Sequence, residues 1–297
     1  MVCLQMTDAL SIDKAQVRRA FSRAAAGYDH AAVLQHEVCR RLGEKLDAMR
    51  LDPARILDAG AGTGYGGRLL LERFPKSRLV ELDIAEGMLH TARSAQPGWK
   101  RWLPVARRDA YLCADLENLP LAAGTMDMVW SNLAIQWCND PDRLFSGLHR
   151  VLSQDGLLIF TTFGPDTLKE LRLAFGELDG FTHVSRFADM HDIGDALMRN
   201  GFAAPVMEME LFTLTYDGLR AVMADLKAIG AHNATEGRRR GLTGKAEWRR
   251  LEQAYERFRR EGKLPATYEV IYGHAWKAEP SRKLPDGSQV VRFRERP

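Results

Sequence analysis

The sequence predicts an α/β fold in which helices cover both faces of a seven-stranded, mostly parallel sheet. Short apolar runs alternate with helical stretches between residues 55 and 163; the runs are RILDAG, SRLVELD, AYLCAD, MDMVWSN and GLLIFTTF. Two further β-rich runs, VMEMELFTL and TYEVIYGHAW, follow later in the chain and complete the set of seven. Strands that alternate with helices at this spacing lie parallel, and their crossovers are right-handed.

Length and composition indicate one large globular domain. The 297 residues are 45% hydrophobic and 27% charged, which is typical of a soluble protein that buries a sizeable core. No apolar run approaches the roughly 18 residues of a membrane span, and the first residues lack a secretory signal. We therefore expect a cytoplasmic protein with no membrane partner. The four cysteines form no C-x-x-C pair and no zinc-binding spacing with histidine, so we expect reduced thiols and no metal.

The first fifty residues predict two helices. Ser11 or Asp13 can cap the first, and the second extends from Ala31 to Met49. The expected buried face of the second helix consists of Val33, Leu34, Val38, Leu42 and Leu46. Further helices are expected at residues 66–74, 85–95, 141–152, 166–178 and 189–200, while the stretch between residues 115 and 127 is expected to be mostly loop.

The last third of the chain predicts a strand, a helical insertion and a final strand. In the run VMEMELFTL, Met207, Met209 and Leu211 alternate with two glutamates, as expected of a strand that buries its apolar face. A helical insertion as long as residues 216–265 is often a lid or a recognition element. We expect one structural domain with four segments: helices at 1–52, an α/β core at 53–215, the insertion at 216–265, and the last strand with a loose tail at 266–297.

Positive charge gathers in one part of the insertion. The segment Arg238–Lys263 contains ten basic and four acidic residues and carries +6, although the whole chain carries only +3. A basic segment on a near-neutral body suggests an acidic partner. A solvated helix face with ion pairs between neighbouring turns accounts for the pattern equally well.

The most informative stretch is the glycine-rich turn in ILDAGAGTG, residues 56–64, where a predicted strand leads into a helix. Glycines let a backbone turn tightly and approach a ligand, and open α/β sheets bind ligands at the carboxyl ends of strands. Gly62, Gly64 and Gly67 satisfy the G-x-G-x-x-G pattern of dinucleotide sites, but that match alone is weak. Asp58 lies just before the turn, where its charge disfavours a pyrophosphate.

S-adenosylmethionine (SAM) fits the same turn better, because it carries a sulfonium and an α-ammonium and no phosphate. Asp58 suits these cations. The ribose hydroxyls need an acid at the end of the second strand, and Asp83 lies there, nineteen residues after Gly64. Asp115 follows the third strand, where it can face the adenine amino group. Three acids at strand ends, together with the glycine turn, predict a SAM site.

This pattern resembles the class I SAM-dependent methyltransferases over residues 56–163. The resemblance implies a Rossmann-like fold, capped over the cofactor by residues 1–52. The fourth strand lacks the N/D-P-P-Y/F motif, which counts against methylation of nucleic-acid bases. The residues expected to bind SAM are Tyr28, Asp58, Gly60, Gly62, Gly64, Asp83, Ile84, Met88, Asp115, Leu116, Asn132 and Leu133.

Four segments are similar to a narrower family, the malonyl-[acyl-carrier protein] O-methyltransferases of biotin synthesis. They are FSRAAAGYDHAAVLQ (21–35), WSNLAIQWC (130–138), FTTFGPDTLKELR (160–172) and LKAIGAHNATEG (226–237). The resemblance implies methyl transfer to the free carboxylate of a malonyl thioester, with acyl-carrier protein as the acidic partner of the basic segment. Arginine hydroxylases that assist assembly of respiratory complex I share parts of these motifs. A SAM-fold assembly factor of that kind, or another small-molecule methyltransferase, is therefore the alternative.

A malonyl carboxylate is already ionised at neutral pH, because carboxyl pKa values lie near ~4, so no general base is expected. The enzyme must instead align the carboxylate and exclude water. The candidates for holding the acceptor are Tyr28, Gln136, Trp137, Arg186, Lys227 and His232. An RNA-binding methyltransferase is disfavoured, because the basic segment lacks the interleaved aromatic residues that stack bases, and we expect no nucleic-acid partner.

Overall fold

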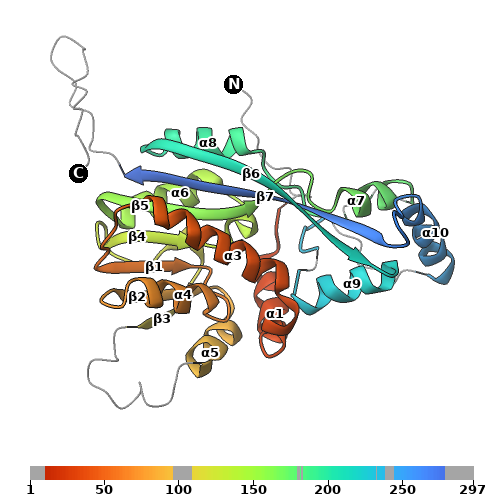
Figure 1. Cartoon of the computed structure of the whole chain (residues 1–297), viewed down its shortest axis with the longest axis horizontal. Helices are drawn as coiled ribbons and strands as arrows, with labels where there is room; N and C mark the ends of the chain where they lie inside the picture. The colour runs from red at the N-terminus through yellow and green to blue at the C-terminus, as the bar shows by residue number, and fades with distance from the viewer. Residues whose placement is uncertain are drawn as a thin grey trace, which may run out of the picture.

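The computed structural model describes residues 11–95, 109–178, 181, 183–231, 233–237 and 244–277. Its centre is a seven-stranded sheet in the order β3-β2-β1-β4-β5-β7-β6 (Figure 1). The strands are β1 (Arg55–Ala59), β2 (Arg78–Asp83), β3 (Ala110–Cys113), β4 (Met126–Ser131), β5 (Leu152–Phe163), β6 (Phe202–Tyr216) and β7 (Leu264–Lys277). Strands β1 to β5 pair in parallel, whereas β7 runs antiparallel to β5 and β6. The fold predicted from the sequence is confirmed.

Helices cover both faces of this sheet. On one face lie α3 (Val33–Lys45) and α4 (Tyr65–Arg73), and on the other lie α6 (Pro141–Val151) and α8 (Met190–Arg199). The remaining helices are α1 (Lys14–Ala24), α2 (Tyr28–Ala31), α5 (Glu86–Ala95), α7 (Lys169–Gly176), α9 (Leu219–Ala228) and α10 (Lys245–Glu256), with short 3-10 turns at Leu46–Ala48, Leu116–Asn118 and Ile135–Trp137. Figure 1 shows α1 beyond the arrowheads of β1 and β4, at the carboxyl end of the parallel strands.

The sheet separates two apolar layers. Neighbouring residues of β1, Ile56 and Leu57, are fully buried and belong to opposite layers. In β4, Trp130 packs on the side of α3 and α4, and Val129 packs on the side of α6 and α8. Strands buried on both faces read as continuous apolar runs, which explains why the sequence marks them so clearly.

Local signals set several helix ends. Asp13 caps α1 and its carboxylate accepts a hydrogen bond from the Gln16 amide at 2.9 Å, as one of the two predicted caps. Asp140 caps α6 in the same way, with Pro141 as the first helical residue. After α8, Gly201 has a φ of +86°, which suits its predicted role in ending the helix.

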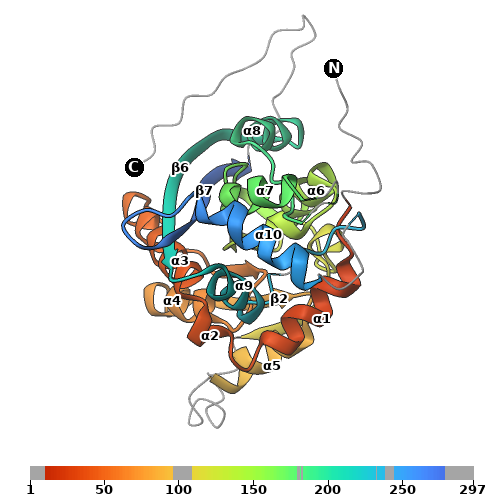
Figure 2. The ribbon, with the colours of Figure 1, turned by 90° about the vertical axis from the view of Figure 1, so that its right-hand side faces the viewer.

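Strands β6 and β7 form a long hairpin that projects away from the rest of the sheet. At its far end, Tyr216 pairs with Leu264. Two helices, α9 and α10, lie between these residues, where the sequence predicts helices, and Figures 1 and 2 place them with α7 around the end of the hairpin. This group of helices therefore lies beside the carboxyl end of the parallel strands and not behind the sheet.

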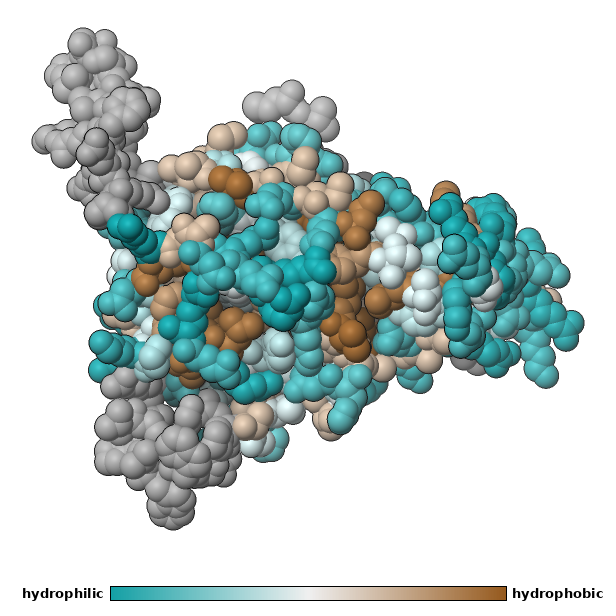
Figure 3. All heavy atoms as spheres, viewed as in Figure 1, coloured by the Kyte–Doolittle hydropathy of each residue, from teal (hydrophilic) through white to brown (hydrophobic). Residues whose placement is uncertain are grey.

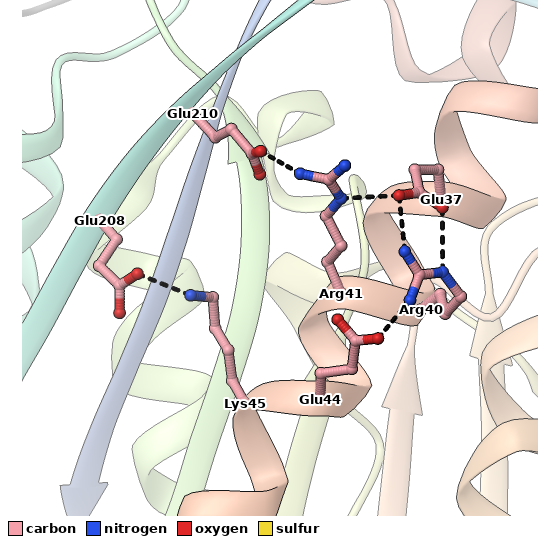
Figure 4. Close-up of polar contacts among 7 residues, drawn as sticks. All are labelled: Glu37, Arg40, Arg41, Glu44, Lys45, Glu208 and Glu210. Carbon is pink, nitrogen blue, oxygen red and sulfur yellow. Dashed lines mark hydrogen bonds and ion pairs between the residues drawn. The ribbon is translucent and has the colours of Figure 1, made fainter.

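Ion pairs join α3 to the edge strand β6 (Figure 4). The Nζ atom of Lys45 lies 2.7 Å from a carboxylate oxygen of Glu208, and Arg41 pairs with Glu210. Arg41 also lies 2.7 Å from Glu37 on its own helix. These side chains are partly exposed, so each pair adds little to the stability of the fold. Together they explain why the acidic face of β6 lies toward α3.

Two predictions about buried faces are wrong. Met209 and Leu211 are 50% and 52% exposed, because the face of β6 that carries Glu208 and Glu210 lies toward α3. Val33 is 67% exposed, because α3 begins there, after the short helix α2 has ended at Ala31. Figure 3 also shows hydrophobic side chains on the surface near the centre of this face, where β6 and β7 cross beside α3.

Within the described ranges, no helix is long and apolar enough to cross a membrane. The same residues contain no group of histidine, cysteine and carboxylate side chains placed to hold a metal ion. Cys39, Cys113 and Cys138 are free thiols. The predicted loose tail after Lys277 lies outside the described residues.

Candidate active site

The glycine-rich turn lies at the carboxyl end of β1 and is held by β2. The amides of Gly60 and Ala61 both donate to the carbonyl oxygen of Leu82, at 2.7 and 2.9 Å. Gly60, Gly62 and Gly64 have φ values of +89°, +56° and +76°, in a region where other residues are strained. A Cβ atom on Gly62 would meet nothing within 4 Å, so the backbone faces open space at this point.

A cavity of about 90 Å³ lies against this turn. Ten of the residues predicted to bind the cofactor line it, namely Tyr28, Gly60, Gly62, Asp83, Ile84, Met88, Asp115, Leu116, Asn132 and Leu133. Helix α1 covers the cavity with Lys14, Val17 and Phe21. Gly64 does not line it; a Cβ there would lie 2.6 Å from Glu81 Oε1, so this glycine lets the turn pack closely on β2.

Asp83 ends β2 and points its carboxylate at the turn. Its Oδ2 accepts a hydrogen bond from the Gly62 amide at 2.9 Å, and its Oδ1 accepts one from the Ala85 amide at 2.8 Å. Burial raises the pKa of Asp83, and these amides oppose that shift. Each oxygen keeps a lone pair for a further donor. The geometry therefore suits two neighbouring hydroxyl groups, as the ribose of SAM presents.

Asp115, the third strand-end acid, is tied to α1. The Nζ atom of Lys14 lies 2.6 Å from Asp115 Oδ1 and also pairs with Glu117. Just before α1, the Asn139 side chain makes two hydrogen bonds to the backbone of Ile12. It accepts from the Ile12 amide at 2.7 Å and donates to the Ile12 carbonyl oxygen at 3.0 Å. The acid predicted to face adenine therefore also anchors the helix that covers the cavity.

Asp58 lines a smaller cavity of about 50 Å³ that shares Tyr28, Gly60, Gly62 and Asn132 with the first. The Asp58 side chain is 2% exposed, and its Oδ2 has no hydrogen-bond partner. Burial raises the pKa of Asp58 well above its usual range, with the charges of two nearby acids adding to the shift. A cation beside this oxygen would stabilise the ionised form. This orphaned acid fits the α-ammonium of SAM and does not fit a phosphate.

A third and larger cavity of about 290 Å³ opens beyond the cofactor cavity. Phe21, Tyr28, Leu133 and Trp137 line both, so the two cavities share a wall. The rest of the lining is mostly apolar and comes from α7, the segment 183–187, α9 and β7. An acceptor in this cavity would lie directly beside the reactive end of a cofactor in the other.

Four of the six acceptor candidates line the large cavity: Tyr28, Gln136, Trp137 and Lys227. Arg186 is exposed and does not line it, although its neighbours Ser185 and Phe187 do. Lys227 is exposed at the edge of the cavity, on α9. His232 lies outside the described residues.

The loop after β4 carries a strained residue into the shared wall. Leu133 has a φ of +48°, in the left-handed region that a branched side chain rarely adopts. Its amide donates to Thr161 Oγ1 at 2.9 Å, and its carbonyl oxygen accepts from Gln136 Nε2 at 2.6 Å. Strain of this kind gathers at functional sites, where surrounding contacts hold it in place.

Sequence spacing did not identify most of the acceptor wall. The rings of Phe175 and His183 stack at 3.9 Å, and the Phe163 and Phe187 rings meet at 5.6 Å. These residues come from separate segments, and no local pattern distinguishes them from ordinary core residues. The sequence predicted the start of α1 from its capping residue, but it gave no sign that Lys14 pairs with Asp115, the acid after β3.

The fold and the glycine turn define a class I SAM-dependent methyltransferase. The methyltransferase domain family matches residues 57–160. Among solved structures, the YcgJ protein of Bacillus subtilis covers 81% of this chain and 99% of its own, with a TM-score of 0.57 and 15% identity. Phosphoethanolamine N-methyltransferase 2 of Haemonchus contortus, solved with S-adenosylhomocysteine, covers 89% of this chain and 60% of its own, with a TM-score of 0.53 and 16% identity. At these identities the likeness shows the fold alone.

Curated relatives narrow the class to one family. The malonyl-[acyl-carrier protein] O-methyltransferase of Laribacter hongkongensis is 59% identical over 291 residues, which are 97% of this chain and 98% of the relative. The enzyme of the same name from Gallionella capsiferriformans is 59% identical over 95% of this chain and 96% of its own. The chain belongs to the malonyl-[acyl-carrier protein] O-methyltransferase family.

Proposed function

We propose that this protein transfers the methyl group of SAM to the free carboxylate of a malonyl thioester on acyl-carrier protein, giving the methyl ester that enters biotin synthesis. The observation that carries the proposal is the wall shared by the two cavities, where Tyr28 and Leu133 face both the cofactor side and the acceptor side. The names of the relatives support the malonyl acceptor. Nothing in the described residues favours the assembly-factor alternative.

When bound, SAM supplies a methyl group activated by a sulfonium. The chain has to align a carboxylate that is already ionised, so the reaction needs no general base. Burial raises the pKa of Tyr28, and the charges of Asp83 and Asp29 add to this effect, so its hydroxyl stays protonated at neutral pH. That hydroxyl can donate a hydrogen bond to the acceptor carboxylate. The apolar wall formed by Phe21 and Trp137, whose rings meet edge-on at 5.3 Å, excludes water and leaves the carboxylate more reactive.

The carrier protein docks on the beginning of α10 in this proposal. Three basic residues there are exposed and make no ion pair with the described residues: Lys245, Arg249 and Arg250. Other cations of the basic segment are already neutralised, in the pairs Arg257–Glu177, Arg259–Glu256 and Lys263–Asp217. The part of the segment at 238–243 lies outside the described residues. Unpaired charge on an exposed helix speeds encounter with an acidic partner.

In this proposal, three of the four segments expected from the sequence contribute to the site. Residues up to 52 provide α1, which covers the cofactor cavity, and α3, which packs on the sheet. The insertion between β6 and β7 provides α9, which lines the acceptor cavity, and α10, which carries the basic surface. The glycine turn and strand-end acids belong to the core between them.

Incubation with SAM and malonyl-carrier protein tests the proposal directly. We expect the carrier to gain the mass of one CH2 group. Acetyl-carrier protein, which has no free carboxylate, is the matched control and should gain nothing. If the protein binds SAM but leaves malonyl-carrier protein and malonyl-coenzyme A unchanged, the proposed acceptor is wrong.

A further inference from the structure

Gln35, on α3, lines the acceptor cavity with a carboxamide that has no hydrogen-bond partner among the described residues. The residue is 9% exposed, and its neighbours on the helix, Leu34 and Val38, belong to the apolar core. A carboxamide offers two N–H donors and one acceptor oxygen. Buried groups of this kind are normally satisfied by protein, water or a ligand, so the amide of Gln35 is available to a substrate in the cavity.

Other polar side chains of the acceptor cavity are already engaged. Gln136 Nε2 donates to the Leu133 carbonyl oxygen at 2.6 Å, and Thr167 Oγ1 donates to a backbone carbonyl oxygen of β7 at 3.0 Å. These two groups hold the wall of the cavity together, and most of the remaining lining is apolar. A charged group that enters the cavity therefore finds few donors, and Gln35 supplies one.

Gln35 lies where the acceptor cavity meets the space beside the glycine turn. With Tyr28, it lines both the acceptor cavity and the small cavity of about 50 Å³ that Gly60 and Gly62 also line. Its backbone carbonyl oxygen accepts a hydrogen bond at 3.1 Å from Nδ2 of Asn132, which follows β4 and lines the cofactor cavity. This bond ties the first turn of α3 to the end of β4, so Gln35 is held where a methyl donor and its acceptor would meet.

We propose that Gln35 Nε2 donates a hydrogen bond to the malonyl carboxylate and orients it for methyl transfer. The inference rests on the proposed function and adds a second donor beside the Tyr28 hydroxyl. Because the amide is neutral, it aligns the carboxylate without cancelling the charge that makes it a nucleophile. Methylation removes that charge, and a hydrogen bond to an ion is roughly twice as strong as one to a neutral group. Gln35 therefore binds the malonyl substrate more tightly than its methyl ester, which helps the product to leave.

Steady-state kinetics with malonyl-carrier protein, together with calorimetry of S-adenosylhomocysteine binding, test this role. Gln35→Met keeps the length of the side chain and removes its donor. We expect it to raise KM about tenfold, the loss expected for one hydrogen bond to a charged group, and to leave kcat and the affinity for S-adenosylhomocysteine within about threefold. Gln154→Met, at an exposed glutamine of β5 outside all three cavities, is the matched control and should change none of these values.

A second variant separates the hydrogen bond from packing by its pH dependence. Gln35→Glu keeps the shape of the side chain but places a negative charge against the substrate carboxylate, so KM at pH 8 should rise further than in Gln35→Met. Most of this additional rise should disappear at pH 6, because the neighbouring like charge raises the pKa of the new carboxyl and its protonated form can donate. Gln35→Met should show the same pH dependence as the wild type.

An unchanged KM in Gln35→Met would overturn the proposal, and so would a KM of Gln35→Glu that stays at the wild-type value at pH 8. A loss of S-adenosylhomocysteine affinity as large as the rise in KM would overturn it as well, because the residue would then support the cofactor site or the fold. A wild-type protein that binds S-adenosylhomocysteine but leaves malonyl-carrier protein unmethylated would instead refute the proposed function. The two failures are therefore distinguishable.

Discussion

Glu81 is a buried acid whose protonation should make the stability of this protein depend on pH. It lies in the middle of β2, is 3% exposed, and has one carboxylate oxygen without a hydrogen-bond partner. Burial raises its pKa from 4.5 to about 7; a hydrogen bond from Tyr111 and the charge of Arg68 oppose the shift, while the charge of Asp109 adds to it. The folded protein therefore favours the protonated acid.

The sign and size of the effect follow from linkage. A carboxyl group whose pKa is raised by folding contributes stability that is fully present below pH 4.5 and lost as the pH rises through about 7. The interval between these values corresponds to about 3 kcal/mol of unfolding free energy, since each pH unit is worth ~1.4 kcal/mol. The variant Glu81→Gln keeps the shape of the protonated acid and removes the titration. We expect it to be about 3 kcal/mol more stable than the wild type at pH 8 and nearly equal to it at pH 4.5.

Urea unfolding followed by circular dichroism, repeated from pH 4.5 to pH 8, measures this difference. Glu72→Gln is the matched control, because Glu72 is exposed on the neighbouring helix α4 and its substitution removes the same charge without changing a buried acid. A stability difference between Glu81→Gln and wild type that stays constant over the whole range would refute the reasoning. It would mean that water or a relaxed side chain solvates the charge in the folded state.

Three further changes test the site. Asp83→Asn should weaken SAM binding about tenfold or more in calorimetry, because the ribose loses a charged acceptor, and unchanged affinity would remove this role. Lys14→Met should speed SAM release in stopped-flow measurements, because α1 loses its ion pairs over the cavity, whereas Arg19→Met, exposed on the same helix, should not. Changing Arg249 and Arg250 together to Glu should raise KM for malonyl-carrier protein at low salt and leave malonyl-coenzyme A unaffected, with the loss shrinking as salt rises. Equal losses with both acceptors would contradict the docking role.

The cavity beside the glycine turn could be predicted because most of the residues expected to line it follow short local patterns. Asp58, Asp83 and Asp115 each follow a run of apolar residues, and parallel pairing of β1, β2 and β3 brings their carboxyl ends to one edge. The glycine turn is contiguous in the chain, and its left-handed conformations require the residues that the motif contains. A pattern confined to a few residues and a pairing rule are sufficient to bring these acids and the turn to one edge of the sheet.

The acceptor side could not be predicted because tertiary packing assembles it. Phe163, Phe175 and Phe187 come from β5, α7 and the loop after it, and each has the spacing of an ordinary core residue. The same limit explains the errors on the edge strand. Alternation of apolar and acidic residues predicted that Met209 would be buried, but the basic residues of α3 decided which face of β6 is covered. A hydrophobic pattern shows which residues of a strand share a face, but it does not show which face another element covers.

Helix α1 connects the cofactor cavity and the acceptor cavity. Variants in α1 should therefore behave differently from variants in α10. The start of α1 is hydrogen-bonded to the segment 233–236. The Asp13 amide donates to the carbonyl oxygen of Ala234, and Gln16 Nε2 donates to the carbonyl oxygen of Asn233 at 3.2 Å. Asn233 lines the acceptor cavity, while Lys14 lines the cofactor cavity. A change that loosens α1 must therefore disturb both cavities, whereas a charge change on α10 reaches neither. Lys14→Met should accordingly raise the SAM dissociation constant and the KM for malonyl-carrier protein together, and a rise in only one of them would mean that α1 closes each cavity independently.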